Sequence, residues 1–216
     1  MASGGARHRL GAAAAVVAFA VGVPAVTAAP AAAGTTSTAA AATTGTAAAA
    51  ADIDYAAWQR DVRAVIDQAL PYVEQRTANA SGEKTAIVFD VDNTTLETDF
   101  HEWYELPTPA VQASLELATY AKSRGAAVFF VTARPGIIHS LTKYNLKSEG
   151  YPLDGLYVRD LPDLFDEVSE YKTRKRAEIE AQGYTIIANV GNRSTDLVGG
   201  HAERTFKLPD YDGALS

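Results

Sequence analysis

Apolar residues along the chain follow two spacings, and together they predict an alternation of helices and strands. Residues 52–76 carry apolar side chains at the spacing of one helix face: Trp58, Val62, Val65, Ile66, Leu70 and Val73. Asp52 or Asp54 can cap the start of this helix, and Pro71 is expected to bend or break it. Continuous apolar runs predict strands at 84–91, 126–133 and 184–191, and shorter strands are predicted at 155–160 and 204–208.

Further helices are predicted between these strands, at residues 108–125, 135–150, 169–183 and 194–200. Pro109 would lie in the first turn of the first of these helices, with Gly125 at its C-cap, and Gly183 would close the third. Strands that are apolar on both faces and alternate with helices indicate an α/β fold. We therefore expect a doubly wound parallel sheet with helices on both of its faces.

The first 51 residues differ from the rest of the chain, because they contain no Asp or Glu and are dominated by Ala, Thr and Val. Arg7 and Arg9 precede an apolar run over residues 10–26, and small residues at 26–28 offer a cleavage signal. This order is typical of a secretory signal peptide. An uncleaved membrane anchor is the alternative, although the run is shorter than the roughly 20 apolar residues that a span prefers.

We therefore divide the chain into three parts: a signal peptide over residues 1–28, an Ala/Thr-rich low-complexity linker over 29–51, and one domain over 52–216. A cleaved signal predicts a secreted, extracellular protein with no stable membrane association. The absence of cysteine excludes thiol catalysis, Cys-ligated metals and an N-terminal lipid anchor.

The domain is acidic, with 17 Lys and Arg against 26 Asp and Glu, because the other two arginines lie in the signal segment. The resulting charge of −9 should repel polyanions, so nucleic acid is not an expected partner. A small phosphorylated molecule is compatible with this charge, since a local cationic site can oppose the overall field. The oligomeric state does not follow from the sequence.

Polar residues gather at one edge of the predicted sheet, beyond the C-terminal ends of the strands, where ligands of such sheets bind. Four separate elements contribute to this set: Asp90, Asp92, Thr132, Arg134, Lys172, Asn192 and Asp196. Each member also has a structural interpretation. An Asp after a strand often forms a turn, Lys172 lies in a basic run typical of a solvated helix face, and Asn192 and Asp196 can cap a short helix.

The pair Asp90 and Asp92 is harder to explain structurally, because neighbouring carboxylates repel unless one is protonated or a cation lies between them. The whole set suits phosphoryl transfer. One carboxylate can attack phosphorus, and the second can protonate the leaving oxygen and later activate water. A divalent cation with oxygen ligands, a lysine and a hydroxyl would screen the repulsion between the carboxylate and the phosphate.

Four segments resemble the motifs of the haloacid dehalogenase (HAD) superfamily: "FDVDNT" at 89–94, "FFVTAR" at 129–134, "YKTRKR" at 171–176 and "NVGNRSTDLVGG" at 189–200. The resemblance covers roughly residues 52–213. Within the superfamily the chain is most similar to the secreted acid phosphatases of the plant acid phosphatase and vegetative storage protein type. The resemblance implies a HAD-like, Rossmann-like fold and a phosphomonoesterase.

The resemblance also implies roles for individual residues. Asp90 would be the nucleophile that forms an aspartyl-phosphate, and Asp92 would be the general acid and base. The residues that bind the substrate or fix the loop beside it would be Thr94, Thr132, Arg134 and Lys172. The cofactor would be Mg²⁺, and its ligands would be Asp90, Asp92, Asn192 and Asp196.

Asn192 departs from the family pattern, which usually has Asp at this position. An amide oxygen can still bind a metal, but Asn192 brings one negative charge fewer. Mg²⁺ binding would then be weaker, or Asp196 would carry more of it. Arg193, where the family often has Gln, adds a cation near the site.

The segment 96–107 between the first motif and the next helix is short, so we expect a small or minimal cap over an open site. Its residues His101, Trp103 and Tyr104 could stack on a nucleoside base or an aryl phosphate. Alternatively, Trp103 could be partly buried and anchor the loop. The leaving group of the phosphomonoester, with nucleotides and aryl phosphates as candidates, is not determined by the sequence.

The primary hypothesis is a secreted, Mg²⁺-dependent acid phosphatase that hydrolyses phosphomonoesters through an aspartyl-phosphate. One alternative is a storage or phosphate-binding protein of the same fold with weak or no catalysis, for which Asn192 argues. Another is a phosphotransferase, in which an alcohol replaces water at the intermediate.

Overall fold

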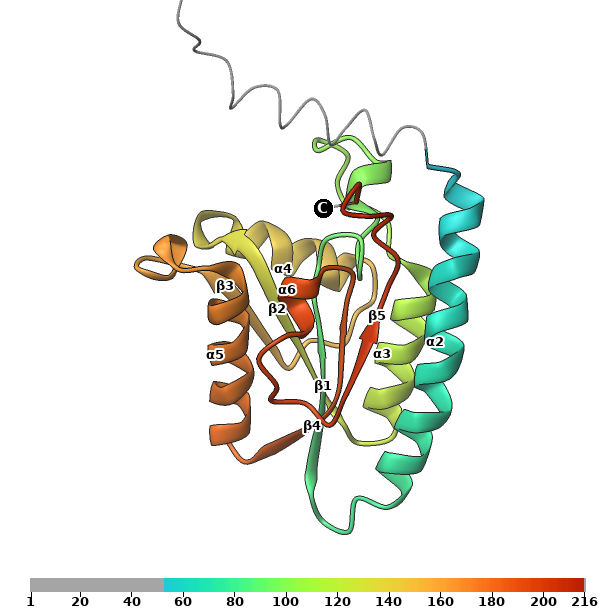
Figure 1. Ribbon diagram of the computed structural model, residues 1–216, viewed down its shortest axis with the longest axis vertical. Coiled ribbons are helices and arrows are strands. Elements are labelled where there is room, and N and C mark those ends of the chain that lie inside the picture. The colour runs from blue at the N-terminus through green and yellow to red at the C-terminus, as the bar shows by residue number, and fades with distance from the viewer. Residues whose placement is uncertain (1–52, 216) are drawn as a thin grey trace, which may run out of the picture. The chain divides into compact units, whose positions relative to one another are not determined.

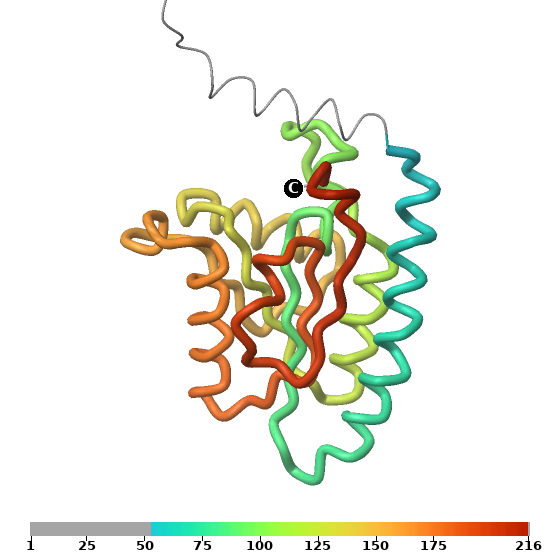
Figure 2. The backbone as a smooth tube through the Cα atoms, viewed as in Figure 1, coloured from blue at the N-terminus to red at the C-terminus, as the bar shows by residue number. Residues whose placement is uncertain are grey.

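The computed structural model describes residues 53–215, and the predicted signal peptide and linker lie outside this range. Five parallel strands form one sheet in the order β3-β2-β1-β4-β5 (Figure 1). The strands are β1 Lys84–Phe89, β2 Ala127–Pro135, β3 Gly155–Arg159, β4 Tyr184–Gly191 and β5 Arg204–Lys207. The order places β1 at the centre, so the loops that follow β1, β2 and β4 meet at one edge (Figure 2).

Helices cover both faces of the sheet, as the sequence predicted. The described helices are α2 Tyr55–Ala78, α3 Gln112–Ser123, α4 His139–Ser148, α5 Val168–Ala181 and the short α6 Ser194–Leu197. Helices α2, α3 and α4 share one hydrophobic core, whereas α5 packs on the opposite face through Tyr171 and Ile179 (Figure 1). None of the described helices is long and apolar enough to cross a membrane.

Alternating side chains of each central strand enter the two cores. In β1, Ile87 and Phe89 lie in the core with α2 and α3, while Ala86 and Val88 lie in the core with α5. Because strand side chains alternate between faces, a strand buried on both sides must be apolar throughout. A large apolar side chain that is fully buried stabilises the fold by about 1.5–3 kcal/mol, which explains why the three strongest apolar runs occupy the centre of the sheet.

The long helix α2 begins as predicted but continues further than expected. Asp54 is its N-cap, and its carboxylate accepts hydrogen bonds from the N–H groups of Ala56 and Ala57. Of the two predicted effects of Pro71, a break does not occur, because α2 runs unbroken to Ala78, whereas a bend stays a prediction. Pro71 and Asp67, whose carbonyl would have received the missing N–H bond, are both exposed, so water can satisfy that carbonyl.

The position of Pro109 was also predicted wrongly. Helix α3 begins at Gln112, so Pro109 precedes it instead of lying in its first turn. The carbonyl of Pro109 accepts a hydrogen bond from Glu97 N–H at 3.0 Å, which ties the incoming segment to the loop after β1. Gly125, Gly150 and Gly183 have positive φ directly after α3, α4 and α5, where a left-handed residue ends a helix.

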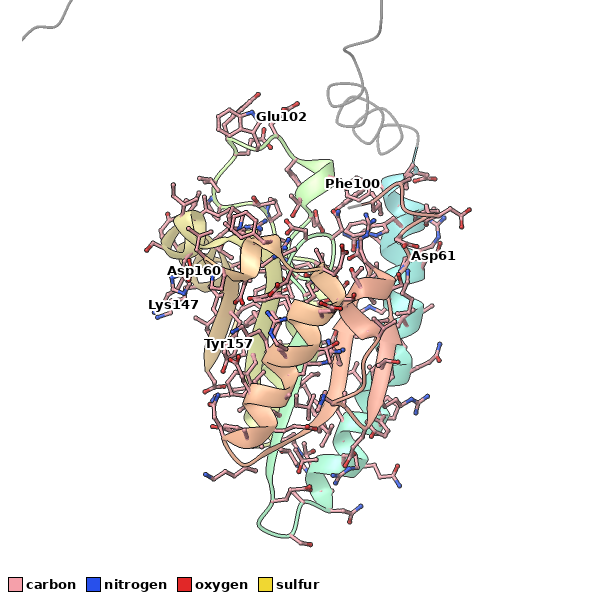
Figure 3. The ribbon with its side chains drawn as sticks, turned by 60° about the vertical axis from the view of Figure 1, so that its left-hand side comes forward. Asp61, Phe100, Glu102, Lys147, Tyr157 and Asp160 are labelled. Carbon is pink, nitrogen blue, oxygen red and sulfur yellow. The ribbon has the colours of Figure 1, made fainter. Side chains whose placement is uncertain are left out.

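The cap is small, because residues 96–107 contain no regular element beyond the single-turn helix η1 Thr98–Phe100. The loop is anchored by Phe100, which stacks on the buried Trp58 of α2 with ring centroids 4.4 Å apart (Figure 3). Trp103 is 87% exposed, so the interpretation of Trp103 as a buried anchor is wrong. Sequence periodicity could not distinguish Phe100 from Trp103 in a loop.

Candidate active site

The loop after β1 holds the first two acids at the edge of the sheet. Asp90 follows Phe89 directly, and its N–H donates to the carbonyl of Val190 in β4 at 3.0 Å. The chain then turns sharply, because the N–H groups of Thr95 and Leu96 return to the carbonyl of Val91. This turn holds the carboxyl of Asp90 in a nearly buried position, 6% exposed.

A buried cation joins two acids from different elements. Lys172, on α5, contacts Oδ1 of Asp90 at 2.5 Å and Oδ1 of Asp196 at 2.6 Å. All three side chains are buried, so the interaction is screened little by water. The basic run around Lys172 is therefore not simply a solvated face, and the lysine that the resemblance indicated points into the site.

These three groups perturb one another's protonation. Burial raises the pKa of Asp90 to about 7; repulsion from Asp196 and Asp92 adds to this increase, and Lys172 opposes it. Burial lowers the pKa of Lys172, but attraction to Asp90 and Asp196 outweighs it, so the pKa of Lys172 lies above 10.5. One cation thus serves two acids, and the cluster favours a further positive charge or a proton at Asp90.

Asp92 is held by the arginine that the sequence assigned to phosphate binding. The guanidinium of Arg134 donates to Oδ1 of Asp92 through Nη2 at 2.6 Å and to both carboxylate oxygens through Nε at 3.1 Å. The hydroxyl of Thr98, in the loop after β1, donates to the same Oδ1 at 2.9 Å. The structure therefore brings Asp92 and Arg134 together as a bidentate ion pair, and this partnership was not predicted.

Thr94 connects the loops after β1 and β4. Its hydroxyl accepts from the main-chain N–H of Asn192 at 3.1 Å and donates weakly to the amide oxygen of Asn192 at 3.4 Å. The side-chain NH₂ of Asn192 donates to the carbonyl of Leu215 at 3.5 Å, which links the C-terminal segment to the site. Thr132 is fully buried, and its hydroxyl accepts from the N–H of Arg134 at 3.2 Å.

The oxygen atoms near Asp90 differ in their freedom to bind a divalent cation. No hydrogen bond within residues 53–215 reaches Oδ2 of Asp90 or the main-chain carbonyl of Asp92. Both oxygens of Asp196 already have a partner, because Lys172 contacts Oδ1 at 2.6 Å and Arg193 N–H donates to Oδ2 at 2.8 Å. Across residues 53–215, no group of three or more His, Cys, Asp or Glu side chains could hold a metal.

Asp90, the carbonyl of Asp92 and the amide oxygen of Asn192 offer the kind of oxygen donors that could hold a divalent cation which keeps several waters. Only one of these three ligands is anionic. The assignment of Asp196 as a ligand stays a prediction, because its two oxygens already accept from Lys172 and from Arg193 N–H.

A hollow of about 260 Å³ opens over these residues, lined by Asp90, Asp92, Ala133, Val168, Lys172, Arg193, Thr195 and Asp196. Six of these eight residues have charged or polar side chains, and the volume lies below the 300–1,000 Å³ that is usual for drug-sized ligands. The hollow has room for a phosphate group, for which Lys172 and Arg193 supply positive charge. Thr195 was missed from the sequence because nothing in its local pattern distinguishes it from a helix residue.

Arg176 is a second residue that the sequence analysis did not single out. It is 1% exposed, and its guanidinium donates to the carbonyls of Asp196 at 2.7 Å and of Gly200 at 2.9 Å, as well as to that of Val198. It therefore clamps the segment that carries Asp196. Lys172 and Arg176 lie four residues apart, and this helical spacing within the basic run was a signal that both could face inwards.

Curated proteins with similar sequences come from plants. The chain is 29% identical over 175 residues to the stem 28 kDa glycoprotein of Glycine max, covering 71% of this chain and 68% of that protein. It is 28% identical over 173 residues to acid phosphatase 1 of Solanum lycopersicum, again covering 71% of this chain and 68% of the relative.

A solved structure with the same fold is the class C acid phosphatase from Bacillus anthracis. The TM-score is 0.62 at 17% identity, and the match covers 78% of this chain and 87% of that chain. At this identity the match shows the fold, which is HAD-like as the sequence predicted.

The family model described as HAD superfamily, subfamily IIIB (acid phosphatase) matches residues 20–106 and 97–214. These segments together span most of the chain, and the family, fold class and enzyme class expected from the four motifs are confirmed. The chain belongs to the acid phosphatase family of HAD subfamily IIIB.

Proposed function

We propose that the protein hydrolyses phosphomonoesters by way of an aspartyl-phosphate on Asp90. The observation that carries this proposal is the buried cluster in which Lys172 holds Asp90 at 2.5 Å, at a hollow of about 260 Å³. Lys172 contacts Oδ1 of Asp90, which keeps a second lone pair for a cation, and Oδ2 is then the oxygen that attacks phosphorus. The ammonium group also offsets the repulsion between an anionic nucleophile and an anionic phosphate.

In the first step, Oδ2 of Asp90 forms a bond to phosphorus while the bond from phosphorus to the leaving oxygen breaks. Asp92, two residues away in the same loop, gives its proton to that oxygen. In the second step, Asp92 takes a proton from water, and the resulting hydroxide displaces Asp90 from phosphorus. The products are the free alcohol and inorganic phosphate, and both acids return to their starting states.

Arg134 must release Asp92 before these two reaction steps can take place. In the structure it holds the carboxylate of Asp92 in a bidentate pair, and in that state Asp92 cannot carry a proton for the leaving group. An incoming phosphate offers the guanidinium an alternative bidentate acceptor. We infer that phosphate binding draws Arg134 away from Asp92 and frees Asp92 for proton transfer.

We further propose that the divalent cation of the family is Mg²⁺, held in this chain by Asp90, the carbonyl of Asp92 and the amide oxygen of Asn192. When bound, it would neutralise charge on the phosphate and on Asp90. The proposal includes secretion of the protein after cleavage of residues 1–28, supported by the basic and apolar order of the signal segment.

Hydrolysis of an aryl phosphate by the purified protein, with Mg²⁺ or with EDTA, tests the proposed function. Asp90→Asn should abolish turnover, whereas Asp67→Asn, the same change on the exposed surface of α2, should keep it. Mass spectrometry after an acid quench should find phosphate on Asp90. Wild-type turnover that survives in Asp90→Asn would refute the assignment of the nucleophile.

The same assay with added alcohol distinguishes hydrolysis from phosphotransfer, because a transferase forms a new phosphomonoester in place of inorganic phosphate. A folded wild-type protein that binds phosphate but turns over none of the phosphomonoesters would instead match the phosphate-binding alternative.

A further inference from the structure

The catalytic hollow has room for a phosphate group but offers little to the rest of a substrate. Six of its eight lining residues have charged or polar side chains, and its volume is about 260 Å³. The leaving group of a phosphomonoester must therefore lie on the surface that continues from this hollow. The C-terminal end of β2 provides that continuity, because Ala133 lines the catalytic hollow and Pro135 lines the next one.

This second hollow has a volume of about 430 Å³ and lies between the loops that follow β2 and β3. Arg134, which pairs with Asp92, stands in the chain between the residues of the two hollows. The apolar part of the lining consists of Pro135, Ile137, Leu161 and Leu164. Figure 3 shows Asp160 of this region and Glu102 of the cap loop at the edge of the sheet that carries the site.

The apolar side chains of this hollow are unusually exposed for their type. Ile137 is 92% exposed, Leu161 70% and Leu164 40%. Scattered exposed apolar residues are ordinary on a protein surface, but a cluster around a hollow next to an active site marks a binding surface. An apolar group that covers these side chains would remove their apolar surface from water, which is energetically favourable.

The loop that presents Leu161 and Leu164 is held in place by internal hydrogen bonds. The guanidinium of Arg159 donates to the carbonyls of Asp163, Leu164 and Asp166. Arg174, on α5, pairs with the carboxylates of Asp163 at 3.0 Å and Asp166 at 2.6 Å. An apolar surface that is already ordered loses little conformational entropy when a ligand binds.

The two loops are also fitted to each other. A Cβ atom at Gly136, beside Ile137, would lie 1.5 Å from Oδ1 of Asp160, beside Leu161. A larger side chain at position 136 would require the exposed carboxylate of Asp160 to move. Gly136, Ile137, Asp160 and Leu161 all line the same hollow, so both loops contribute to it.

We propose that the hollow formed by Ile137, Leu161 and Leu164 binds the apolar body of the leaving group, so that the preferred substrates are phosphomonoesters of alkyl or aryl alcohols. This inference rests on the proposed phosphatase function, because it assumes that the phosphate lies beside Asp90. The hollow adds affinity in proportion to the apolar surface that the leaving group covers.

Binding of alkylphosphonates to the full-length protein tests the proposal without requiring turnover. The series from methyl- to hexylphosphonate keeps the anionic group constant, and calorimetric titration gives the affinity of each member. We expect affinity to rise about fourfold for each methylene that is buried. The double variant Ile137→Asn with Leu161→Asn should reduce the advantage of hexyl- over methylphosphonate at least about tenfold.

Trp103→Asn is the matched control, because Trp103 is an exposed apolar side chain of the cap loop and lies outside the hollow. Thermal unfolding of each variant shows whether the fold is kept. Equal affinity across the series, or a chain-length preference that survives in the double variant, would overturn the proposal. A preference lost in Trp103→Asn alone would overturn it too, since the leaving group would then lie on the cap loop.

Turnover of methyl to hexyl phosphate separates this proposal from the function on which it rests. A chain-length preference in binding, without hydrolysis of any member, would support the hollow and remove the phosphatase function. Hydrolysis of every member at the same kcat/KM, with equal affinities, would keep the phosphatase function and remove the hollow.

Discussion

Asp90→Asn should stabilise the folded protein while it abolishes catalysis. Asp90 and Asp196 share the single cation Lys172, with contacts of 2.5 Å and 2.6 Å, inside a buried cluster. The substitution removes one acid and leaves Lys172 paired with Asp196. The amide oxygen of Asn can still accept from Lys172, so the shape and one hydrogen bond of the site are retained.

The expected gain follows from the protonation of Asp90. Burial raises the pKa of Asp90 from 3.8 to about 7, and such a difference corresponds to about 4 kcal/mol. Because the folded state binds the proton more tightly than the unfolded chain, Asp90 lowers stability by about 1.4 kcal/mol per pH unit between about pH 4 and 7. Above the pKa of Asp90 in the folded state, the lowered free energy of unfolding no longer changes with pH.

We therefore expect Asp90→Asn to exceed the wild type in free energy of unfolding by about 2–4 kcal/mol at pH 8. At pH 5 the gain should shrink to about 1 kcal/mol, because folded wild-type Asp90 is then protonated. Urea unfolding in EDTA and phosphate-free buffer, followed by the fluorescence of the buried Trp58, measures both values.

Asp67→Asn serves as the control, since the side chain of Asp67 is 60% exposed and its substitution should change the free energy of unfolding little. Equal stability of Asp90→Asn and wild type at pH 8, or a gain that does not decrease between pH 8 and pH 5, would refute this account of the cluster.

Three further changes probe the same region. Lys172→Met leaves Asp90 and Asp196 buried without a cation and should lower stability by about 3–5 kcal/mol at pH 8, with a smaller loss at pH 5 where Asp90 is protonated. Lys175→Met, on the same helix, should cost less than about 1 kcal/mol, and equal losses in urea unfolding would contradict the pairing. Arg176→Met removes the donor of three carbonyls and should cost about 3 kcal/mol, with faster hydrogen exchange in residues 196–200. Asn192→Asp adds a carboxylate and should tighten Mg²⁺ binding about tenfold, seen as a larger rise in Tm with added Mg²⁺ than the wild type shows; an unchanged rise would exclude residue 192 from the metal site.

Much of the fold followed from local features of the sequence. Apolar runs such as 84–91 and 184–191 indicated strands buried on both faces, and the helices between them implied a parallel sheet. Asp54 was one of the two residues predicted as a cap, because capping depends on adjacent residues. The errors at Pro71 and Pro109 arose because solvent exposure and contacts with distant segments decide what a proline does to a helix.

The sequence predicted which residues form the candidate site, but not which of them contact one another. Parallel strands bring their C-terminal ends to one edge, so Asp90, Asp92, Lys172 and Asp196 could be grouped from order along the chain alone. Their motifs then indicated the family. The role of Arg176 was hidden in a basic run whose helical spacing alone could have revealed it.

Only the tertiary structure decided which charges meet. Lys172 lies 82 residues from Asp90 in sequence, and Arg134 lies 42 residues from Asp92, yet each pair is in direct contact. The apolar hollow likewise forms where residues 135–137, at the end of β2 and after it, come close to residues 159–164, at the end of β3 and after it. The spacing of apolar residues determines which segments form helices and strands, because that spacing is a property of neighbouring residues. The order of these segments along the chain determines the edge of the sheet at which the strands end. The pairing of buried charges depends on distances of a few ångströms between remote segments, and only the packed core determines those.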